Sequence, residues 1–188
     1  IQAVAAAEVY EQIRAAEVGG AYTASVASTF ATDAIQNAVR WSVRTLFQEQ
    51  EDRKTTFNEL GQSMQRWVAQ PGRDTIIQNA SHDPYKPRFA RVPYGAKTCA
   101  FCLVMASRGF VYKSEENAGL MDKFHHECDC QIVPTFNRSQ IEGYDPDHLY
   151  GMYQEARKVG GSDIHGIVKA MRRIYPDDLT DGVTEKAA

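Results

Sequence analysis

The sequence lacks any long uninterrupted apolar run. Nowhere in its 188 residues does an apolar stretch approach the roughly 18 to 20 residues that a helix needs to cross a bilayer. The alanine-rich start carries Glu8 and Glu11 and no basic segment, so it does not have the pattern of a secretory signal. We therefore expect a soluble protein that has no membrane among its partners.

An excess of positive charge is also missing. The chain has 21 Lys and Arg against 24 Asp and Glu, a formal net charge of -3. A dedicated nucleic-acid binder usually carries a broad basic surface. DNA is therefore expected to be a secondary partner at most, although local basic pairs such as Arg172-Arg173 occur.

Recognisable catalytic motifs are absent as well. There is no Gly-rich phosphate loop, no Gly-x-Ser-x-Gly and no His-Glu-x-x-His. The acidic pairs Glu115-Glu116 and Asp177-Asp178 are more typical of solvated surface than of a paired acid and base. We expect no enzymatic activity and no small-molecule substrate.

Cysteine is scarce, but its four residues form two close pairs. The pairs are Cys99-x-x-Cys102 and Cys128-x-Cys130. A Cys-x-x-Cys turn presents two thiolates to one ion, and a second pair can complete a tetrahedral zinc site. His125 is a fifth candidate, because it precedes Cys128 by one helical turn and could replace one of the last two cysteines. The spacing predicts one structural zinc ion per chain.

Three other interpretations stay open. The cysteines could pack as small core residues, or they could form disulfides, although no secretory pattern favours oxidation. A small zinc-braced nuclease of the HNH kind would use His125-His126, Asn137 and His148, which occur in a suitable order. The neighbouring thiolates, however, would draw at least one of the first two imidazoles to zinc and away from a catalytic ion.

Helical periodicity dominates the first third of the chain. Residues 2–17 have apolar side chains at helical intervals and end at Gly19-Gly20. Residues 22–68 continue the pattern as one or two long helices, forming either an extended arm or an antiparallel hairpin. Pro71-Gly72 is predicted to end this part. We therefore divide the chain into a helical arm or hairpin over 1–70 and a second part over 71–188.

The second part has a mixed character. An irregular loop is predicted over 73–98, a short helix over 99–107 that ends at Gly109, and two helices over 147–159 and 163–175. Brief strands are predicted over 110–112 and 131–133, the second stopping at Pro134. The expected fold class is α+β, mostly α: a long N-terminal helical region, a small zinc-braced α+β lobe, and C-terminal helices.

A series of motifs in this second part resembles a known family. The motifs are Ala90-Arg91-Val92-Pro93-Tyr94-Gly95, Cys99-Ala100-Phe101-Cys102, Ser107-Arg108-Gly109-Phe110-Val111-Tyr112 and His125-x-x-Cys128-Asp129-Cys130-x-x-Val133-Pro134. In this order they resemble the MuF-like minor head proteins of tailed bacteriophages, in the type common among phages of actinobacteria. The resemblance covers residues 73 to about 155.

The resemblance implies a minor capsid protein of head morphogenesis, present in few copies inside the phage head near the portal. Its partners would be the portal or the major capsid protein, with packaged DNA as a weak further contact. It implies no catalysis in this module. Carried over by position, the metal-site residues are Cys99, Cys102, His125, Cys128 and Cys130. Asp129 stands where the family often has a basic residue, which argues against a DNA contact by this loop.

Overall fold

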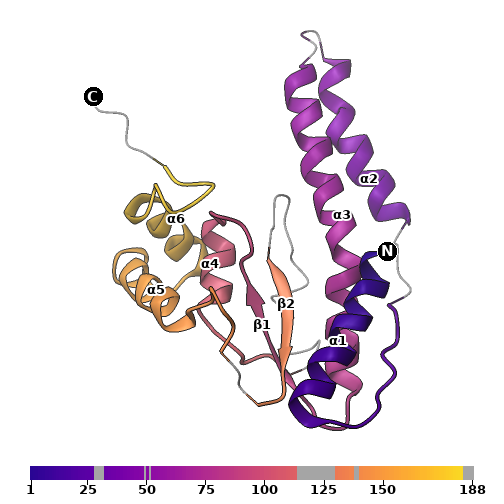
Figure 1. The fold of residues 1–188 in the computed structure, drawn as a ribbon. Helices are drawn as coiled ribbons and strands as arrows, with labels where there is room; N and C mark the ends of the chain where they lie inside the picture. The colour runs from indigo at the N-terminus through magenta and orange to yellow at the C-terminus, as the bar shows by residue number, and fades with distance from the viewer. Residues whose placement is uncertain (28–31, 49, 51, 114–129, 138–139, 184–188) are drawn as a thin grey trace. The chain divides into compact units, whose positions relative to one another are not determined.

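The computed structural model describes residues 1–27, 32–48, 50, 52–113, 130–137 and 140–183. The chain divides into two compact units: the described part of the first lies within Ile1–His82, and that of the second within Asp83–Lys113 and Asp129–Ala188. The described elements are mostly helices, with a single two-stranded sheet (Figure 1). The predicted fold class, α+β and mostly α, is confirmed. None of the described helices is long and apolar enough to span a membrane.

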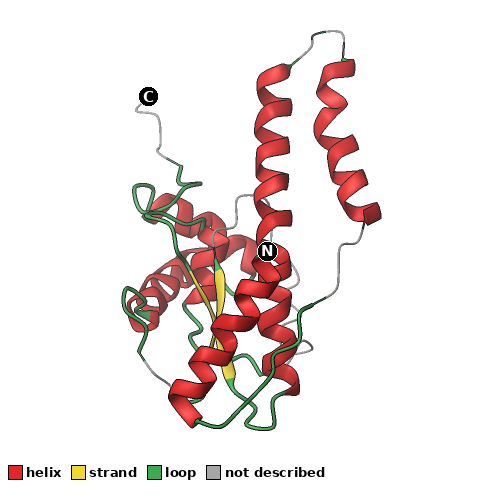
Figure 2. Cartoon of the chain, turned by 45° about the vertical axis from the view of Figure 1, so that its right-hand side comes forward, coloured by secondary structure: helices red, strands yellow, loops and turns green. Residues whose placement is uncertain are grey.

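The first unit is built on one long helix. The helices are α1 (Gln2–Val18), α2 (Thr32–Ser42), the short 3-10 helix η1 (Val43–Phe47) and α3 (Arg53–His82). Figures 1 and 2 show α1 beside one half of α3 and α2 beside the other half. The predicted helix over 2–17 is confirmed. The predicted helical stretch from residue 22 is wrong at its start, because residues 21–27 are not helical.

An antiparallel hairpin is formed by α2, η1 and α3. Arg44 of η1 donates to Glu59 Oε1 of α3 at 3.0 Å, and its guanidinium lies 3.9 Å from the centre of the Trp41 ring. The hydroxyls of Thr45 and Thr56 form a buried hydrogen bond of 2.5 Å between the same two elements. These contacts fix η1 against the first turns of α3.

The prediction that Pro71-Gly72 ends the helical part is wrong, because α3 continues through both residues to His82. Proline removes one backbone hydrogen bond from a helix interior, and its ring disturbs the preceding turn. Here Pro71 is buried, and Gly72 faces the backbone of α1. A Cβ atom at position 72 would lie 3.4 Å from the carbonyl oxygen of Gln2 and 3.7 Å from the Cβ of Ala6. The pair thus serves the packing of two helices.

The second unit contains the sheet. Strand β1 (Arg88–Val92) pairs antiparallel with β2 (Gln131–Thr135), with Arg91 opposite Ile132 and Phe89 opposite Pro134. The irregular loop predicted over 73–98 is therefore wrong in two places, the end of α3 and the whole of β1. The predicted stop at Pro134 is also wrong. The N–H and C=O groups of Phe89 bond to Tyr112 instead, so Pro134 needs no N–H toward β1.

Three helices complete the second unit. They are α4 (Ala100–Ala106), α5 (Pro146–Gly160) and α6 (Ile164–Ile174), and α4 packs against α5, α6 and β1. Asp163 caps α6 by accepting from the N–H of Gly166 at 3.0 Å. The helix predicted over 147–159 begins at Pro146, where Asp145 is the N-cap and accepts from the N–H of His148 at 3.0 Å. The shared core consists of buried small and aliphatic residues: Ala100, Leu103, Val104, Met105, Met152, Ala156, Ile167, Val168, Ala170, Met171 and Leu179.

Candidate metal centre

The first cysteine pair forms the N-terminal turn of α4. Cys99 is the N-cap residue, and its Sγ accepts a hydrogen bond from the backbone N–H of Cys102 at 3.3 Å. Both side chains are buried, with 7% of Cys99 and none of Cys102 exposed. An N–H···S bond at a helix N-terminus favours the thiolate, which is the form that binds metal. The Cys-x-x-Cys motif therefore adopts a conformation suited to a ligand pair.

Cys130 lies directly before β2 and is fully buried. Tyr144 lies against the end of α4, where its hydroxyl donates to the carbonyl of Ala106 at 2.6 Å. Burial first, and then the negative charges of Tyr112 and Cys130, raise the pKa of Tyr144 above its usual range. Cys99, Cys102 and Cys130 are all outside any disulfide.

The structure adds a residue that sequence reasoning did not assign to the site. Arg91 of β1 has none of its surface exposed, and its Nη2 lies 3.9 Å from Cys102 Sγ. Ile132 is opposite Arg91 in the sheet, so these two side chains project from the same face, and Cys130 directly precedes the strand that carries Ile132. The apolar neighbours Ala90 and Val92 were a signal of a buried strand, but the three nearby prolines favoured a loop.

The remaining candidate ligands, His125 and Cys128, lie outside the described residues, as does His126. Within the described part of the chain, no group of three or more His, Cys, Asp and Glu side chains is arranged to hold a metal ion. Cys130 is therefore not placed in one ligand set with Cys99 and Cys102. The donors are nevertheless of the kind that zinc prefers, because Cys99, Cys102 and Cys130 each supply a soft sulfur atom. Zinc binding remains a prediction.

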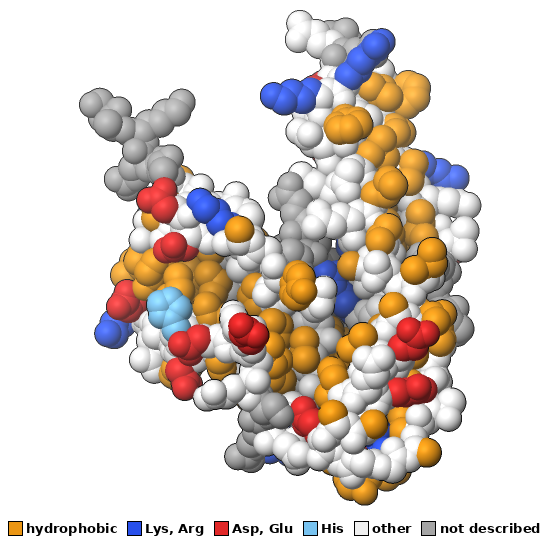
Figure 3. Space-filling view, viewed as in Figure 1, with side chains coloured by type: hydrophobic (Ala, Val, Ile, Leu, Met, Phe, Trp, Pro, Cys, Tyr) orange, Lys and Arg blue, Asp and Glu red, His pale blue; other side chains and the backbone are white. Residues whose placement is uncertain are grey.

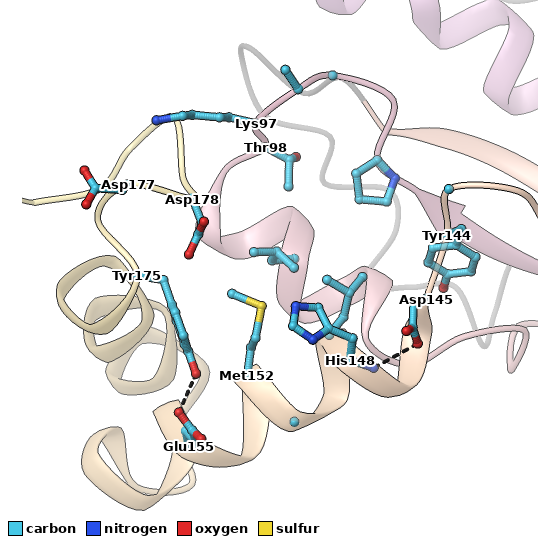
Figure 4. Close-up of a pocket in the computed structure, with 17 residues that line it drawn as sticks. Lys97, Thr98, Tyr144, Asp145, His148, Met152, Glu155, Tyr175, Asp177 and Asp178 are labelled. Atoms are coloured by element: carbon cyan, nitrogen blue, oxygen red, sulfur yellow. Dashed lines mark hydrogen bonds between the residues drawn. The ribbon is translucent and has the colours of Figure 1, made fainter.

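A second feature of this unit is an open cleft of about 730 Å³ between α5, the segment before α4 and the segment after α6 (Figure 4). Its apolar floor includes Leu103, Leu149 and Met152. Four carboxylates line it, from Asp145, Glu155, Asp177 and Asp178, against the single lysine Lys97. Such a charge balance repels phosphate.

Two aspects of the cleft bear on the nuclease alternative. His148 lines the cleft from the first turn of α5, whereas Asn137 follows β2 and is not among the lining residues. Tyr175 points toward Glu155 across the cleft and donates to its Oε2 at 2.5 Å (Figure 4). The described nuclease candidates are thus not brought together, and the charge around His148 is unsuited to a DNA backbone.

Comparisons with known proteins identify the family. The VG15 protein family matches residues 1–156, which is most of the chain. The chain is 33% identical over 104 residues to the Gene 15 protein of Mycobacterium phage D29 and 30% identical over 128 residues to that of Mycobacterium phage L5. These matches cover 38% and 43% of the two relatives, so the chain spans less than half the length of either. No solved structure matches.

The chain therefore belongs to the VG15 family, and it is a bacteriophage protein. The predicted phage origin is confirmed. The narrower resemblance to MuF-like minor head proteins is not decided by these matches, and it is taken up as a proposal.

Proposed function

We propose that this chain is a minor capsid protein of MuF-like type, which acts in head morphogenesis inside the phage head near the portal. It is made in the host cytoplasm and becomes part of the virion. Its helical unit docks on the portal or the major capsid protein, and its second unit is braced by zinc. The module carries out no catalysis and binds no small-molecule substrate. DNA is at most a weak additional contact.

The observation that carries the proposal is an apolar stripe left exposed along α3, formed by Phe57, Met64 and Val68. These residues are spaced by seven and four positions, so they lie on one face of the helix. Phe57 is 77% exposed and Met64 68% exposed. Trp41 and Phe47 add exposed aromatic area on the neighbouring elements, and Figure 3 shows apolar side chains gathered over this part of the first unit. Large exposed apolar side chains that lie together usually mark an interaction surface.

The docking role is tested by removing the stripe without disturbing the fold. In the double variant Phe57→Ser/Met64→Ser, both side chains point away from the core, so the free protein should keep its helical content and melting temperature. Particles assembled with this variant should contain several-fold less of the protein, measured by mass spectrometry of purified heads. The control is Asn58→Ser/Gln65→Ser, which changes the adjacent exposed positions of the same helix and should be incorporated normally.

Other outcomes assign the stripe differently. If purified particles contain none of the wild-type protein, the minor capsid role is wrong. If the wild-type protein sediments as a dimer and the double variant sediments as a monomer, the stripe binds a second copy of the chain and not the portal or capsid protein.

Zinc would be held by Cys99 and Cys102 from the first turn of α4, together with two of the three candidates Cys130, Cys128 and His125. When bound, it would link segments that are distant in sequence, because a structural zinc ion contributes folding free energy and does no redox chemistry. The supporting observation is the burial of the three described thiols in one small unit. Elemental analysis of purified protein should give about one zinc per chain.

The nuclease alternative has a direct test. Plasmid DNA incubated with the protein and Mg²⁺ or Mn²⁺ should remain uncut, because the described cleft is acidic and repels phosphate. Cleavage that is abolished by His126→Ala but unaffected by Phe57→Ser/Met64→Ser would favour the nuclease over the assembly role.

A further inference from the structure

We propose that the cleft of about 730 Å³ in the second unit, which we call the acidic cleft, docks a basic segment of a protein partner. A lysine side chain of the partner lies along the apolar floor, and its ammonium group meets the carboxylates around it. Every residue involved belongs to the described part of the second unit. Neither zinc nor the apolar stripe of α3 is required.

The size and the floor of the acidic cleft suit a long hydrocarbon stem. Its volume is within the range of pockets that take ligands in proteins. The floor is formed by Leu103 of α4 together with Leu149 and Met152 of α5. A lysine side chain gains from contact with such a surface, because its four methylene groups are apolar while its head remains charged.

The charge of the cleft selects a cation as the occupant. Glu155 lies on α5 and Asp178 in the segment after α6, and both are exposed. Figure 4 shows Asp178 directed into the cleft, toward Met152, whereas the side chain of Lys97 extends along the rim. Lys97 is the one Lys or Arg among the lining residues, so negative charge remains in excess for a cation from outside to neutralise.

The hydrogen bonds in the cleft leave acceptor capacity for an ammonium group. Tyr175 donates to Glu155 Oε2 at 2.5 Å, and Asp145 Oδ1 accepts from the N–H of His148 at 3.0 Å (Figure 4). The two oxygens of a carboxylate together accept about four hydrogen bonds. Each of these carboxylates can therefore accept from an ammonium group without giving up the bond that positions it.

A protein segment fits this site better than a free amine or a nucleic acid. The phosphates of a nucleic acid are repelled by the carboxylates. Tyr94 stands between the lining residues Pro93 and Gly95 and is 76% exposed. Exposed aromatic side chains of this kind are enriched in protein interfaces. A polypeptide supplies the stem, the cation and flanking residues that contact Tyr94, whereas a free amine supplies only the first two.

Binding is measured by fluorescence anisotropy with the full chain and a short labelled peptide of alternating lysine and leucine. The same peptide with glutamate in place of lysine should not bind. The affinity for the lysine peptide should fall as salt is added, because exposed charges are screened.

The first variant places a cation of the chain's own in the cleft. Position 151 lines the cleft, has nothing within 4 Å of an added Cβ atom, and lies one helical turn before Glu155. Gly151→Lys should therefore keep the fold and weaken binding of the lysine peptide roughly tenfold or more, because its ammonium group competes for the same carboxylates. The control is Gln154→Lys, which adds the same charge at an exposed position of α5 outside the cleft and should change the affinity by less than about twofold.

The second variant removes the negative charge from the cleft. Glu155→Gln/Asp178→Asn should weaken binding roughly three- to twentyfold, since exposed ion pairs contribute modestly. Glu142→Gln/Asp147→Asn removes the same charge from exposed positions that do not line the cleft, and it should bind like the wild type.

Three outcomes would overturn the inference. The first is a wild-type protein that does not bind the lysine peptide. The second is equal weakening by each variant and its control, which would assign the binding to the net charge of the chain and not to the cleft. The third is spermidine that binds as tightly as the peptide and responds in the same way to the variants, which would make the ligand a free amine. None of these results depends on incorporation of the protein into particles, which the α3 variants test separately.

Discussion

The backbones of Gly160 and Gly166 are in direct contact where the end of α5 meets the start of α6. A Cβ atom on either residue would overlap the carbonyl group of the other. Gly161, directly after α5, has φ of 79°, a left-handed conformation that glycine adopts without strain. The end of α5 therefore combines two requirements, a close approach by Gly160 and a left-handed turn at Gly161.

This contact predicts a steric effect of substitution. Gly166→Ala should lower the free energy of unfolding by about 1 to 3 kcal/mol or more, because the overlapping atoms are backbone and cannot move aside easily. Gly151→Ala is the matched control in α5: nothing lies within 4 Å of its added Cβ, and alanine favours a helix by about 0.5 to 1 kcal/mol. Urea denaturation of both variants measures the difference. Equal stability of the two variants would show that α5 and α6 are not packed this closely.

Asn79 of α3 holds the segment before α2 through side-chain hydrogen bonds. Its Oδ1 accepts from the N–H of Ser25 at 2.9 Å, and its Nδ2 donates to the carbonyl of Ser25 at 2.8 Å. The amide thus pairs with both backbone groups of one residue and is itself buried. Asn79→Ala should destabilise the first unit by about 2 kcal/mol and speed hydrogen exchange of the Ser25 amide.

The control for this prediction is Asn58→Ala, an exposed asparagine of the same helix, which should leave both quantities nearly unchanged. If Asn79→Ala destabilises the protein but the Ser25 amide exchanges at its original rate, the segment is held by other contacts.

We expect ionisation of the Tyr175 hydroxyl to lower the stability of the folded protein at alkaline pH. Burial, and then the hydrogen bond to Glu155, raise the pKa of Tyr175 to about 12. The unfolded chain has a tyrosine pKa near 10, so between about pH 10 and pH 12 the folded state binds more protons than the unfolded state. The stability linked to Tyr175 is therefore complete below pH 10 and is lost as the pH rises toward 12.

This pH dependence is measured by unfolding at a series of alkaline pH values. Tyr175→Phe should remove that part of the slope and also a tyrosinate absorbance that appears near pH 12. Glu155→Gln should shift the absorbance of Tyr175 to lower pH, because it removes the nearby negative charge while burial remains. A Tyr175→Phe protein with an unchanged alkaline slope would contradict the assignment.

The sequence predicted those features of the fold that depend on nearby residues. The existence of α1, α4, α5 and α6 followed from apolar periodicity and from local signals of helix ends such as Gly19-Gly20 and Gly109. The prediction of a helix end at Pro71-Gly72 was wrong, because the packing of α1 on α3 outweighed the general tendency of proline and glycine to end a helix. Strand β1 was missed because its partner β2 lies some forty positions away, and pairing at that distance leaves little local signal.

The candidate site was likewise predictable only where it depends on residues that are close in sequence. The Cys99-x-x-Cys102 spacing indicated a ligand turn, and the structure places both side chains in the first turn of α4. The burial of Arg91 beside Cys102 could not be derived, because it depends on the β1–β2 register and on the packing of α4 against β1. A charged residue in a proline-rich stretch is otherwise expected at the surface.

The identity of the ligands is tested by a pair of neighbouring histidines. If His125 binds zinc by its one-turn spacing from Cys128, His125→Ala should weaken zinc binding strongly, and His126→Ala should change it little. Cys102→Ser should lower zinc affinity further and cost several kcal/mol of stability in zinc-loaded protein, because structural zinc contributes on the order of 10 kcal/mol to small modules. In excess chelator the same variant should melt close to the metal-free wild type, which separates metal loss from a packing defect. A larger effect of His126→Ala than of His125→Ala would assign the imidazole ligand to the shorter His126-x-Cys128 spacing, and equal small effects of both would favour a site of four thiolates.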